Sequence, residues 1–452
     1  MMKNYQFALI AFLFLFGIQS NVLAQKNFGY YNGMQNLPQS HYYNPSWNAK
    51  NKLYFSIGTG MHSVGISNSG FALKDVLVAR PQDDSLVISP AGAIDKMARN
   101  NFLSATAQNE LLGFGIKVKQ NYFSFAVINR FDFSFAYPKD FVKLIFEGNG
   151  GSLLGQRANM DGLGLNMNSY MEYGVGFNRE FLDAKLKVGV RAKLLSGIAN
   201  VHTKKSVLGL TTDQETFDLT IDGALDLRTS GIPDSTQQFD QSGAYNFKNH
   251  GTAFDFGATY AVSEKLKITA SILDVGSIKW TQNVHNYNRT DFTYTFKGAD
   301  INQALNDSNY LQNIQDTLKN VFLLDKNSQS YRTALPTRII LGGNYDINSL
   351  FGVGAVWFSD FANKKYRPTL SLTGTLHVKN WLFVNLNYSM TARSAKNIGF
   401  GFALKGLGMS YFVATDNILA ALNPAGAKVF HISTGLGFCI GRTDKDKINK
   451  AE

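Results

Sequence analysis

Hydrophobic and polar residues alternate strictly along several stretches of this 452-residue chain. The segment FDLTIDGALDLR (217–228) places its Phe, Leu and Ile side chains on one face and its Asp and Arg side chains on the other. The segments TLSLTGTLHV (369–378) and NYFSFAVINRFDFSFAY (121–137) follow the same period. A period of two predicts β-strands with one apolar and one polar face. Ordinary strands have about five or six residues, whereas membrane-crossing strands need about 9–11, so the length of these runs favours a membrane barrel.

The connections between the predicted strands give an independent indication of the fold. The pattern predicts fourteen strands, at 52–66, 108–118, 121–136, 163–178, 185–200, 250–262, 265–281, 336–347, 351–360, 367–378, 381–392, 396–405, 407–415 and 428–440. Short connections follow every even-numbered strand except the last, and long insertions follow the odd-numbered strands. Outer-membrane barrels have short periplasmic turns and long outer loops. The sequence therefore predicts an all-β transmembrane antiparallel barrel over 52–440, with both termini in the periplasm of a Gram-negative cell.

Two features of the long insertions leave the details of this barrel open. The strand-like segment 214–228 either extends a hairpin above the membrane or joins the wall, which would raise the count to sixteen strands. Short helices are predicted in the loops, one between Pro138 and Gly148 and one around 311–321. The second helix has an apolar stripe that packs on its own loop, caps the barrel, or contacts a partner or lipid.

The two ends of the chain differ in composition from the barrel segment. Residues 1–24 have a basic start, an apolar run at 7–18 and the small-residue pattern VLA before Gln25, which predicts a cleaved signal peptide. The segment 25–51 contains amides, prolines and aromatic residues, and we interpret it either as a plug in the lumen or as a disordered periplasmic lead-in. A charged periplasmic tail is expected at 441–452. The single Cys439 excludes an intramolecular disulfide.

Charge gives little indication of a partner. The chain has 44 Lys and Arg against 33 Asp and Glu, a formal net charge of +11. Because the basic residues are scattered singly, the pattern argues against nucleic acid binding. We expect outer-membrane lipid or lipopolysaccharide as the neighbour of this basic surface.

Motifs for catalysis or metal binding are absent from the sequence. The seven His residues have no zinc-like spacing, and no GxSxG, phosphate-loop or HExxH motif is found. Ser371 and His377 lie on one predicted strand, roughly 20 Å apart at about 3.3 Å per residue, and cannot form a catalytic pair. We therefore expect no enzyme activity, metal or cofactor.

Charged residues on the inward faces of the predicted strands are the candidate binding residues. Strand parity points six of them into the lumen: Arg130, Asp132, Lys187, Arg191, Lys193 and Arg338. They either pair with one another and with the plug, or form a site for an anionic headgroup that carries an apolar tail. Arg suits such a site because its guanidinium binds carboxylates with two hydrogen bonds.

Six segments, read in order, resemble a known family. They are QNLPQSHYYNPSW, FDFSFAYPKDFVKLIFEGNG, VGVRAKLLSGIANV, ASILDVGSIKW, LPTRIILGGNY and YFVATDNILAALNPAG. Together they resemble a Bacteroidota outer-membrane barrel family of unassigned function. That family is similar in layout to the fatty-acid transporter FadL and to the barrels PorV and PorP of the type IX secretion system.

The resemblance implies a fourteen-stranded barrel with an N-terminal hatch that contains an NPA-like element. Asn44, Pro45 and Ser46 occupy that place here, with Ser instead of Ala. The residues expected to form the plug are Asn36, Pro38, Gln39, Ser40, Asn44 and Pro45. The expected function is binding or uptake of a hydrophobic or amphipathic small molecule, released by movement of 25–51. The alternative is an accessory barrel that binds other outer-membrane or secretion proteins, which predicts an exposed apolar patch on the loop 282–335.

Overall fold

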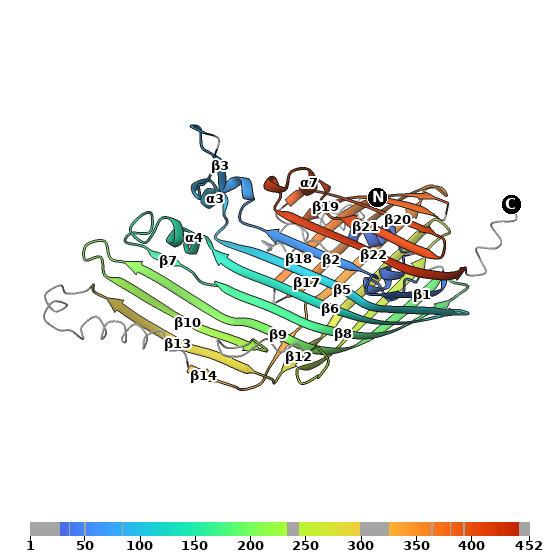
Figure 1. Ribbon diagram of the computed structural model, residues 1–452, viewed down its shortest axis with the longest axis horizontal. Helices are drawn as coiled ribbons and strands as arrows, with labels where there is room; N and C mark the ends of the chain where they lie inside the picture. The colour runs from blue at the N-terminus through green and yellow to red at the C-terminus, as the bar shows by residue number, and fades with distance from the viewer. Residues whose placement is uncertain are drawn as a thin grey trace, which may run out of the picture.

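The fold is all-β, a closed antiparallel barrel from which an elongated sheet projects at one end (Figure 1). The computed structural model describes residues 28–35, 37–48, 51–83, 85–232, 244–298, 325–362, 365–379, 381–391 and 394–442. The signal peptide at 1–24, Asn36, the helix at 311–321 and the tail from 443 onward lie outside the described residues. In the described part of the chain, no helix has the length and apolar character needed to cross a membrane.

Fourteen strands form the wall of the barrel, as the alternation predicted. The first of them consists of two pieces, β1 (Asn51–Ile57) and β2 (His62–Asn68). The others are β5 (Asn100–Val118), β6 (Asn121–Pro138), β8 (Gly164–Phe181), β9 (Leu186–Thr212), β11 (His250–Ala261), β12 (Leu266–Trp280), β16 (Thr337–Asp346), β17 (Phe351–Ala362), β18 (Lys365–Val378), β19 (Leu382–Thr391), β20 (Ser394–Gly406), β21 (Met409–Thr415) and β22 (Val429–Arg442). The sheet closes because β1 pairs with β5 on one side and with β22 on the other.

The break in the first wall strand differs from the uninterrupted strand predicted at 52–66. The backbone leaves the ladder at 58–61, where Gly58 has a φ of +67°. A Cβ atom on Gly60 would lie 2.0 Å from Oε1 of Glu110. Only glycine therefore allows the backbone to approach this buried side chain so closely.

The alternation divides the wall into an apolar outer face and a polar inner face. On β6 the outward Phe123 is 45% exposed, whereas the inward neighbours Ser124 and Arg130 are buried. On β18 the outward Leu372 is 48% exposed, and the inward Ser371 is buried. Exposed Phe, Leu, Ile and Val side chains suit hydrocarbon, and closure of the ring leaves no strand edge unpaired in lipid.

The connections keep the predicted parity along the ring. Short turns join β5 to β6, β8 to β9, β11 to β12, β16 to β17, β18 to β19 and β20 to β21. All of them lie at the end of the barrel where β1 begins and β22 ends. The long connections lie at the opposite end.

The projecting sheet continues several wall strands beyond the ring. Up to Ser196, β9 pairs with β11; further on, from Asn200 to Thr212, it pairs with β10 (Leu219–Ser230). β10 pairs in turn with β13 (Val284–Phe296), and a small strand, β14 (Asp325–Asn327), follows β13 (Figure 1). The segment predicted at 214–228 thus extends a hairpin, and the sixteen-strand alternative is wrong because the ring closes without it.

Short elements occupy the long connections. These are η2 (Leu73–Asp75), β3 (Leu77–Ala79), β4 (Leu86–Ile88), α3 (Ala91–Lys96), α4 (Lys139–Phe146), β7 (Arg157–Asn159), β15 (Tyr331–Ala334), α7 (Ile418–Leu422) and η4 (Pro424–Gly426). α4 coincides with the helix expected between Pro138 and Gly148. Pro138 precedes its first turn, and Gly148 follows its end with a φ of +75°.

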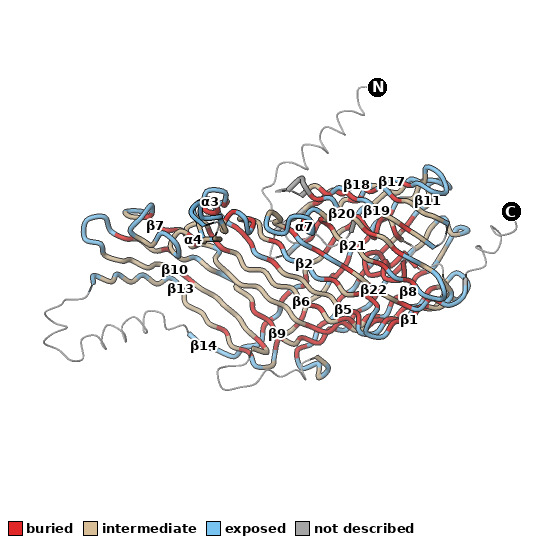
Figure 2. Tube along the Cα trace, turned by 45° about the horizontal axis from the view of Figure 1, so that its top comes forward, coloured by how far each residue is buried: buried red, intermediate tan, exposed pale blue. Residues whose placement is uncertain are grey.

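Residues 28–48, which we call the inner segment, lie inside the barrel (Figures 1 and 2). The segment contains α2 (Phe28–Gly33) and η1 (Pro38–Tyr42), and it contacts wall strands around the ring. Its aromatic side chains form the centre of the luminal core: Tyr31 stacks on Tyr43 with 4.1 Å between ring centroids. Such a pair contributes about 0.5–1.5 kcal/mol beyond its buried area.

Polar side chains fix the inner segment to the wall. Gln39 Nε2 donates to the carbonyl of Gly60 at 2.8 Å, and Asn178 Nδ2 donates to the carbonyl of Pro45 at 3.0 Å. Asn44 Nδ2 donates to the carbonyl of Ala270 at 3.2 Å. The Oγ of Ser40 instead donates within the segment, to the carbonyl of Leu37 at 2.7 Å, and Pro38 begins η1.

Candidate functional site in the barrel lumen

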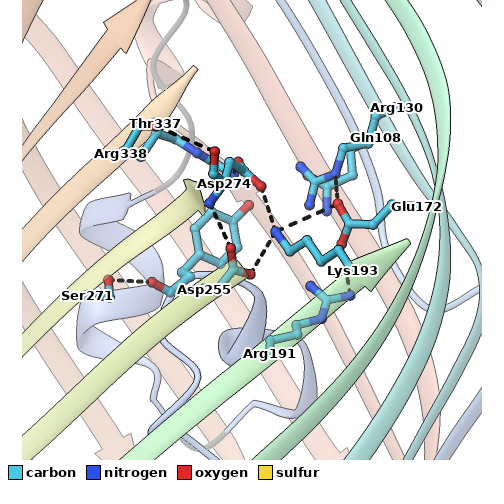
Figure 3. Close-up of polar contacts among 11 residues, drawn as sticks. Gln108, Arg130, Glu172, Arg191, Lys193, Asp255, Ser271, Asp274, Thr337 and Arg338 are labelled. Carbon is cyan, nitrogen blue, oxygen red and sulfur yellow. Dashed lines mark hydrogen bonds and ion pairs between the residues drawn. The ribbon is translucent and has the colours of Figure 1, made fainter. Parts of the chain in front are cut away.

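Four of the six inward residues expected from the sequence meet on the inner wall. Arg130, Arg191, Lys193 and Arg338 come from β6, β9 and β16, and all four are buried. They join three carboxylates, so that seven residues form a luminal ion network: Arg130, Glu172, Arg191, Lys193, Asp255, Asp274 and Arg338 (Figure 3). Their mutual pairing is one of the two arrangements that the sequence left open.

Glu172 on β8 connects one half of the network. Its Oε2 accepts a hydrogen bond from Arg130 Nε at 2.6 Å and lies 3.8 Å from Lys193 Nζ. Its Oε1 lies 2.9 Å from Arg191 Nη2. Three cations around one fully buried carboxylate offset the large cost of removing these charges from water.

Asp274 on β12 connects the other half. Lys193 Nζ lies 2.5 Å from Asp274 Oδ1 and 2.7 Å from Asp255 Oδ2, and Arg338 donates to Asp274 Oδ2. Asp274 has a φ of +59° at a bulge between β11 and β12. Asp255 Oδ1 accepts the backbone N–H of Asp274 at 2.7 Å and so stabilises this conformation.

The sequence interpretation missed the three carboxylates of the network. The parity rule that identified the inward cations also points Glu172 and Asp255 inward, and Asp255 lies between the exposed Phe254 and Phe256. The rule fails for Asp274, because the bulge places Leu273 and Asp274 in succession on the buried side. A bulge shifts the face of every later residue, and the local pattern of residues does not mark where it occurs.

Lys187 does not belong to this network. It lies near the beginning of β9, at the end with the short turns, and its Nζ is 3.0 Å from Glu180 Oε1. Lys117 contacts the same carboxylate oxygen at 2.9 Å. The sequence grouped Lys187 with the other inward residues because parity gives the face of a strand but not the height along the barrel.

A cavity adjoins the network and contains the fifth expected residue, Asp132. Arg130, Asp132, Gln108 and Arg338 line it, together with Thr106, Ala107, Ser63, His431 and Tyr43 of the inner segment. About 350 Å³ of empty space lies within it and at its mouth. Arg130 Nη1 donates to Gln108 Oε1 at 3.1 Å (Figure 3), so this guanidinium connects the cavity to Glu172.

The network also touches the inner segment directly. The guanidinium carbon of Arg191 lies 4.8 Å from the ring centre of Tyr42. A cation over a buried aromatic ring contributes about 2 kcal/mol when both are desolvated. The chain of contacts from Arg130 through Glu172 and Arg191 to Tyr42 therefore links the cavity to the inner segment.

Among the described residues, no group of three or more His, Cys, Asp and Glu side chains is placed to hold a metal ion. The network carboxylates are instead occupied by Arg and Lys.

Comparison with known proteins gives a family and several structural likenesses. The toluene transporter TbuX of Ralstonia pickettii is 9% identical, with 95% of this chain and 99% of that chain covered and a TM-score of 0.42. A FadL homologue of Pseudomonas aeruginosa is 9% identical over 93% and 98% of the two chains, with a TM-score of 0.44. The toluene transporter TodX of Pseudomonas putida is 9% identical over 92% and 98%, with a TM-score of 0.41.

No curated protein matches the sequence. A family model, described as a family of unknown function (DUF5723), matches residues 45–416, which is most of the chain and includes the whole luminal ion network. The chain therefore belongs to the DUF5723 family.

Proposed function

We propose that this protein is an outer-membrane channel that binds a small amphipathic anion in its lumen and lets it pass when the inner segment moves. The observation that carries this proposal is the cavity in which Arg130 and Arg338 lie beside Tyr43 of the inner segment. The arginines that would bind the anion and the inner segment that blocks the lumen thus line the same cavity.

The two arginines suit an anionic group. Each guanidinium has five N–H donors. Arg130 donates hydrogen bonds to Glu172 and Gln108, and Arg338 donates one to Asp274. Donors remain for a carboxylate or a related anion in the cavity, and the neighbouring ring of Tyr43 offers apolar contact to the rest of the molecule.

The inner segment would be the gate. Most of its described residues are buried, and it is hydrogen-bonded to several wall strands, including a contact of 2.6 Å between Ser46 Oγ and Thr259 Oγ1 of β11. A solute can therefore cross the ring only if these contacts open. The apolar outer wall supports insertion in the outer membrane, and the short turns support a periplasmic orientation for the end where β1 begins and β22 ends.

Binding of a fluorescent probe, dansylundecanoate, to the purified barrel in detergent tests the first step. We expect Arg130→Gln and Arg338→Gln each to weaken binding at least tenfold. Lys267→Gln is the matched control, because Lys267 is 41% exposed and pairs with Asp346 away from the cavity. Equal affinity in all three variants would contradict an anion site at the cavity.

A second candidate function is docking of a protein partner on the projecting sheet. β9, β10 and β13 extend beyond the ring, and Phe292, Tyr294 and Phe296 share one face of β13. These rings are half-buried and belong to the loop 282–335, for which an exposed patch was predicted. Residues 299–324 of that loop lie outside the described residues. Native mass spectrometry would favour docking if a stoichiometric protein partner accompanied a barrel without a bound small molecule.

A further inference from the structure

A serine, a histidine and an aspartate line up on the inner wall beside the cavity. Ser63 Oγ and His431 Nε2 are 2.9 Å apart, and His431 Nδ1 is 3.4 Å from Asp416 Oδ2. All three residues are buried, and Ser63 and His431 both line the cavity that contains Arg130 and Arg338. The order nucleophile, imidazole, carboxylate is the geometry of a hydrolytic triad.

The register of three neighbouring strands produces this alignment. Gly65 of β2 pairs with His431 of β22, and Ser63 lies two residues from Gly65 on the same inward face. Because Gly65 has no side chain, the imidazole can lean across the ladder toward Ser63. Asp416 directly follows β21, whose last residue, Thr415, pairs with Ile432 beside His431.

We propose that Ser63 and His431 are the nucleophile and the general base of an esterase site, with Asp416 as a positioning residue for the imidazole. The substrate class is a carboxylic ester that also carries an anionic group, which Arg130 and Arg338 would bind. This activity goes beyond the proposed passage of a small anion, since hydrolysis in the cavity needs no movement of the inner segment.

The reaction balances with water as the only co-reactant. Ser63 Oγ attacks the ester carbonyl while its proton passes to His431 Nε2; the bond to the alcohol oxygen then breaks, and His431 gives the proton to that oxygen. Water attacks the acyl-serine, and its proton moves through His431 back to Ser63 Oγ as the acid leaves. Ester and water become acid and alcohol, with no change of oxidation state.

Gln108 is the candidate donor for the oxyanion. It pairs directly opposite Ser63 in the ladder between β2 and β5. Arg130 donates a hydrogen bond to one of its two amide atoms. Because a guanidinium can only donate, this atom must be the oxygen Oε1, and the other amide atom is the nitrogen Nε2. Within the described part of the chain this Nε2 is buried and has no hydrogen-bond partner. A buried, unpaired N–H beside a nucleophile can stabilise developing negative charge.

Asp416 would keep the proton of the neutral imidazole on Nδ1, so that the unprotonated Nε2 is the nitrogen that accepts the proton of Ser63. Asp416→Asn preserves shape but favours the opposite tautomer. We expect this change to lower kcat by about 10³-fold with little effect on KM, and to change the pH profile of kcat.

The test uses the full-length barrel purified in detergent, with para-nitrophenyl succinate as the anionic ester and para-nitrophenyl butyrate as the neutral one. We expect hydrolysis that prefers the succinate ester, loss of that hydrolysis in Ser63→Ala and His431→Gln, and labelling of Ser63 by a fluorophosphonate. Ser67→Ala is the matched control: Ser67 is a buried serine on the same face of β2. Heat-dependent gel migration verifies that each variant is a folded barrel.

Hydrolysis no faster than that of folded Ser63→Ala, or equal loss in Ser67→Ala, would overturn the esterase site. Arg130→Gln should raise KM for the succinate ester alone, and an equal effect on the butyrate ester would overturn the assigned substrate class. Failure of the channel proposal is a separate result, because dansylundecanoate binding does not require Ser63 Oγ.

Discussion

Glu172 provides the strongest test of the luminal ion network. In Glu172→Gln the side chain keeps its shape but loses its charge, with Arg130, Arg191 and Lys193 within 3.8 Å of it. Arg130 would retain Gln108, and Lys193 would retain two carboxylates. Arg191 has no second ion pair among the described residues, and its guanidinium lies over the ring of Tyr42, so this arginine would lose its ion-pair partner while staying buried.

Removing one partner of a buried ion pair costs about 3–5 kcal/mol, and we expect a loss of that size in the free energy of unfolding. The measurement is reversible unfolding in guanidinium chloride, with the barrel in lipid vesicles and tryptophan fluorescence as the signal. Glu172→Gln combined with Arg191→Gln removes the orphaned charge and should be no less stable than the single variant.

Asp346→Asn is the control for this measurement. Asp346 pairs with Lys267 at 3.0 Å, but both side chains are about 40% exposed, and such a pair contributes about 0–1 kcal/mol. If Glu172→Gln destabilised the barrel no more than Asp346→Asn, the network would not be the buried, mutually compensated cluster described above.

Two further predictions concern the inner segment and an outer loop. Gly189→Ala should loosen the inner segment, because a Cβ atom there would lie 2.1 Å from the carbonyl oxygen of Pro45. Faster proteolysis of the segment would show this loosening. Gly374→Ala is the control and should not change the proteolysis rate, because a Cβ atom at Gly374 would have nothing within 4 Å. Burial alone would raise the pKa of Asp75, but its bonds with Lys96 and a backbone N–H outweigh this and lower the pKa below 3.8. The stabilisation is therefore complete above the unfolded value of 3.8 and is lost as the pH falls through the lower folded pKa. Hydrogen exchange in 72–96 should rise only in that acidic range, and a rise between pH 5 and pH 7 would refute the assignment.

The wall could be predicted from sequence because one physical requirement acts on every strand. Lipid demands an apolar outer face, so the period of two persists along β6 and β18 regardless of their partners. The break at 58–61 was missed because the close approach of Gly60 to the buried Glu110 involves a residue on another strand. The alternation of apolar and polar residues along one strand carries no information on how closely its backbone approaches a side chain of another strand.

The candidate site was predictable only in part, for a related reason. Parity correctly pointed Arg130 and Arg338 inward, but it could not separate Lys187, which lies at another height. Ser63 and His431 are 368 positions apart in the chain and meet because the ring closes between β2 and β22. Ser371 and His377, which lie too far apart on one strand to form a catalytic pair, show that residue type alone does not identify such a site without the strand register.

A disulfide between the inner segment and the wall tests directly whether passage requires the inner segment to move. Ser46→Cys with Thr259→Cys, in a Cys439→Ala background, places the sulfurs where two oxygens now lie 2.6 Å apart. Ser371→Cys with Ser389→Cys is the control, since those oxygens are also 2.6 Å apart but both belong to wall strands. We predict that the oxidised gate variant stops dansylundecanoate from crossing vesicles until it is reduced, while the oxidised control conducts normally. Equal passage through the oxidised and reduced gate variant would show that passage does not require the inner segment to move.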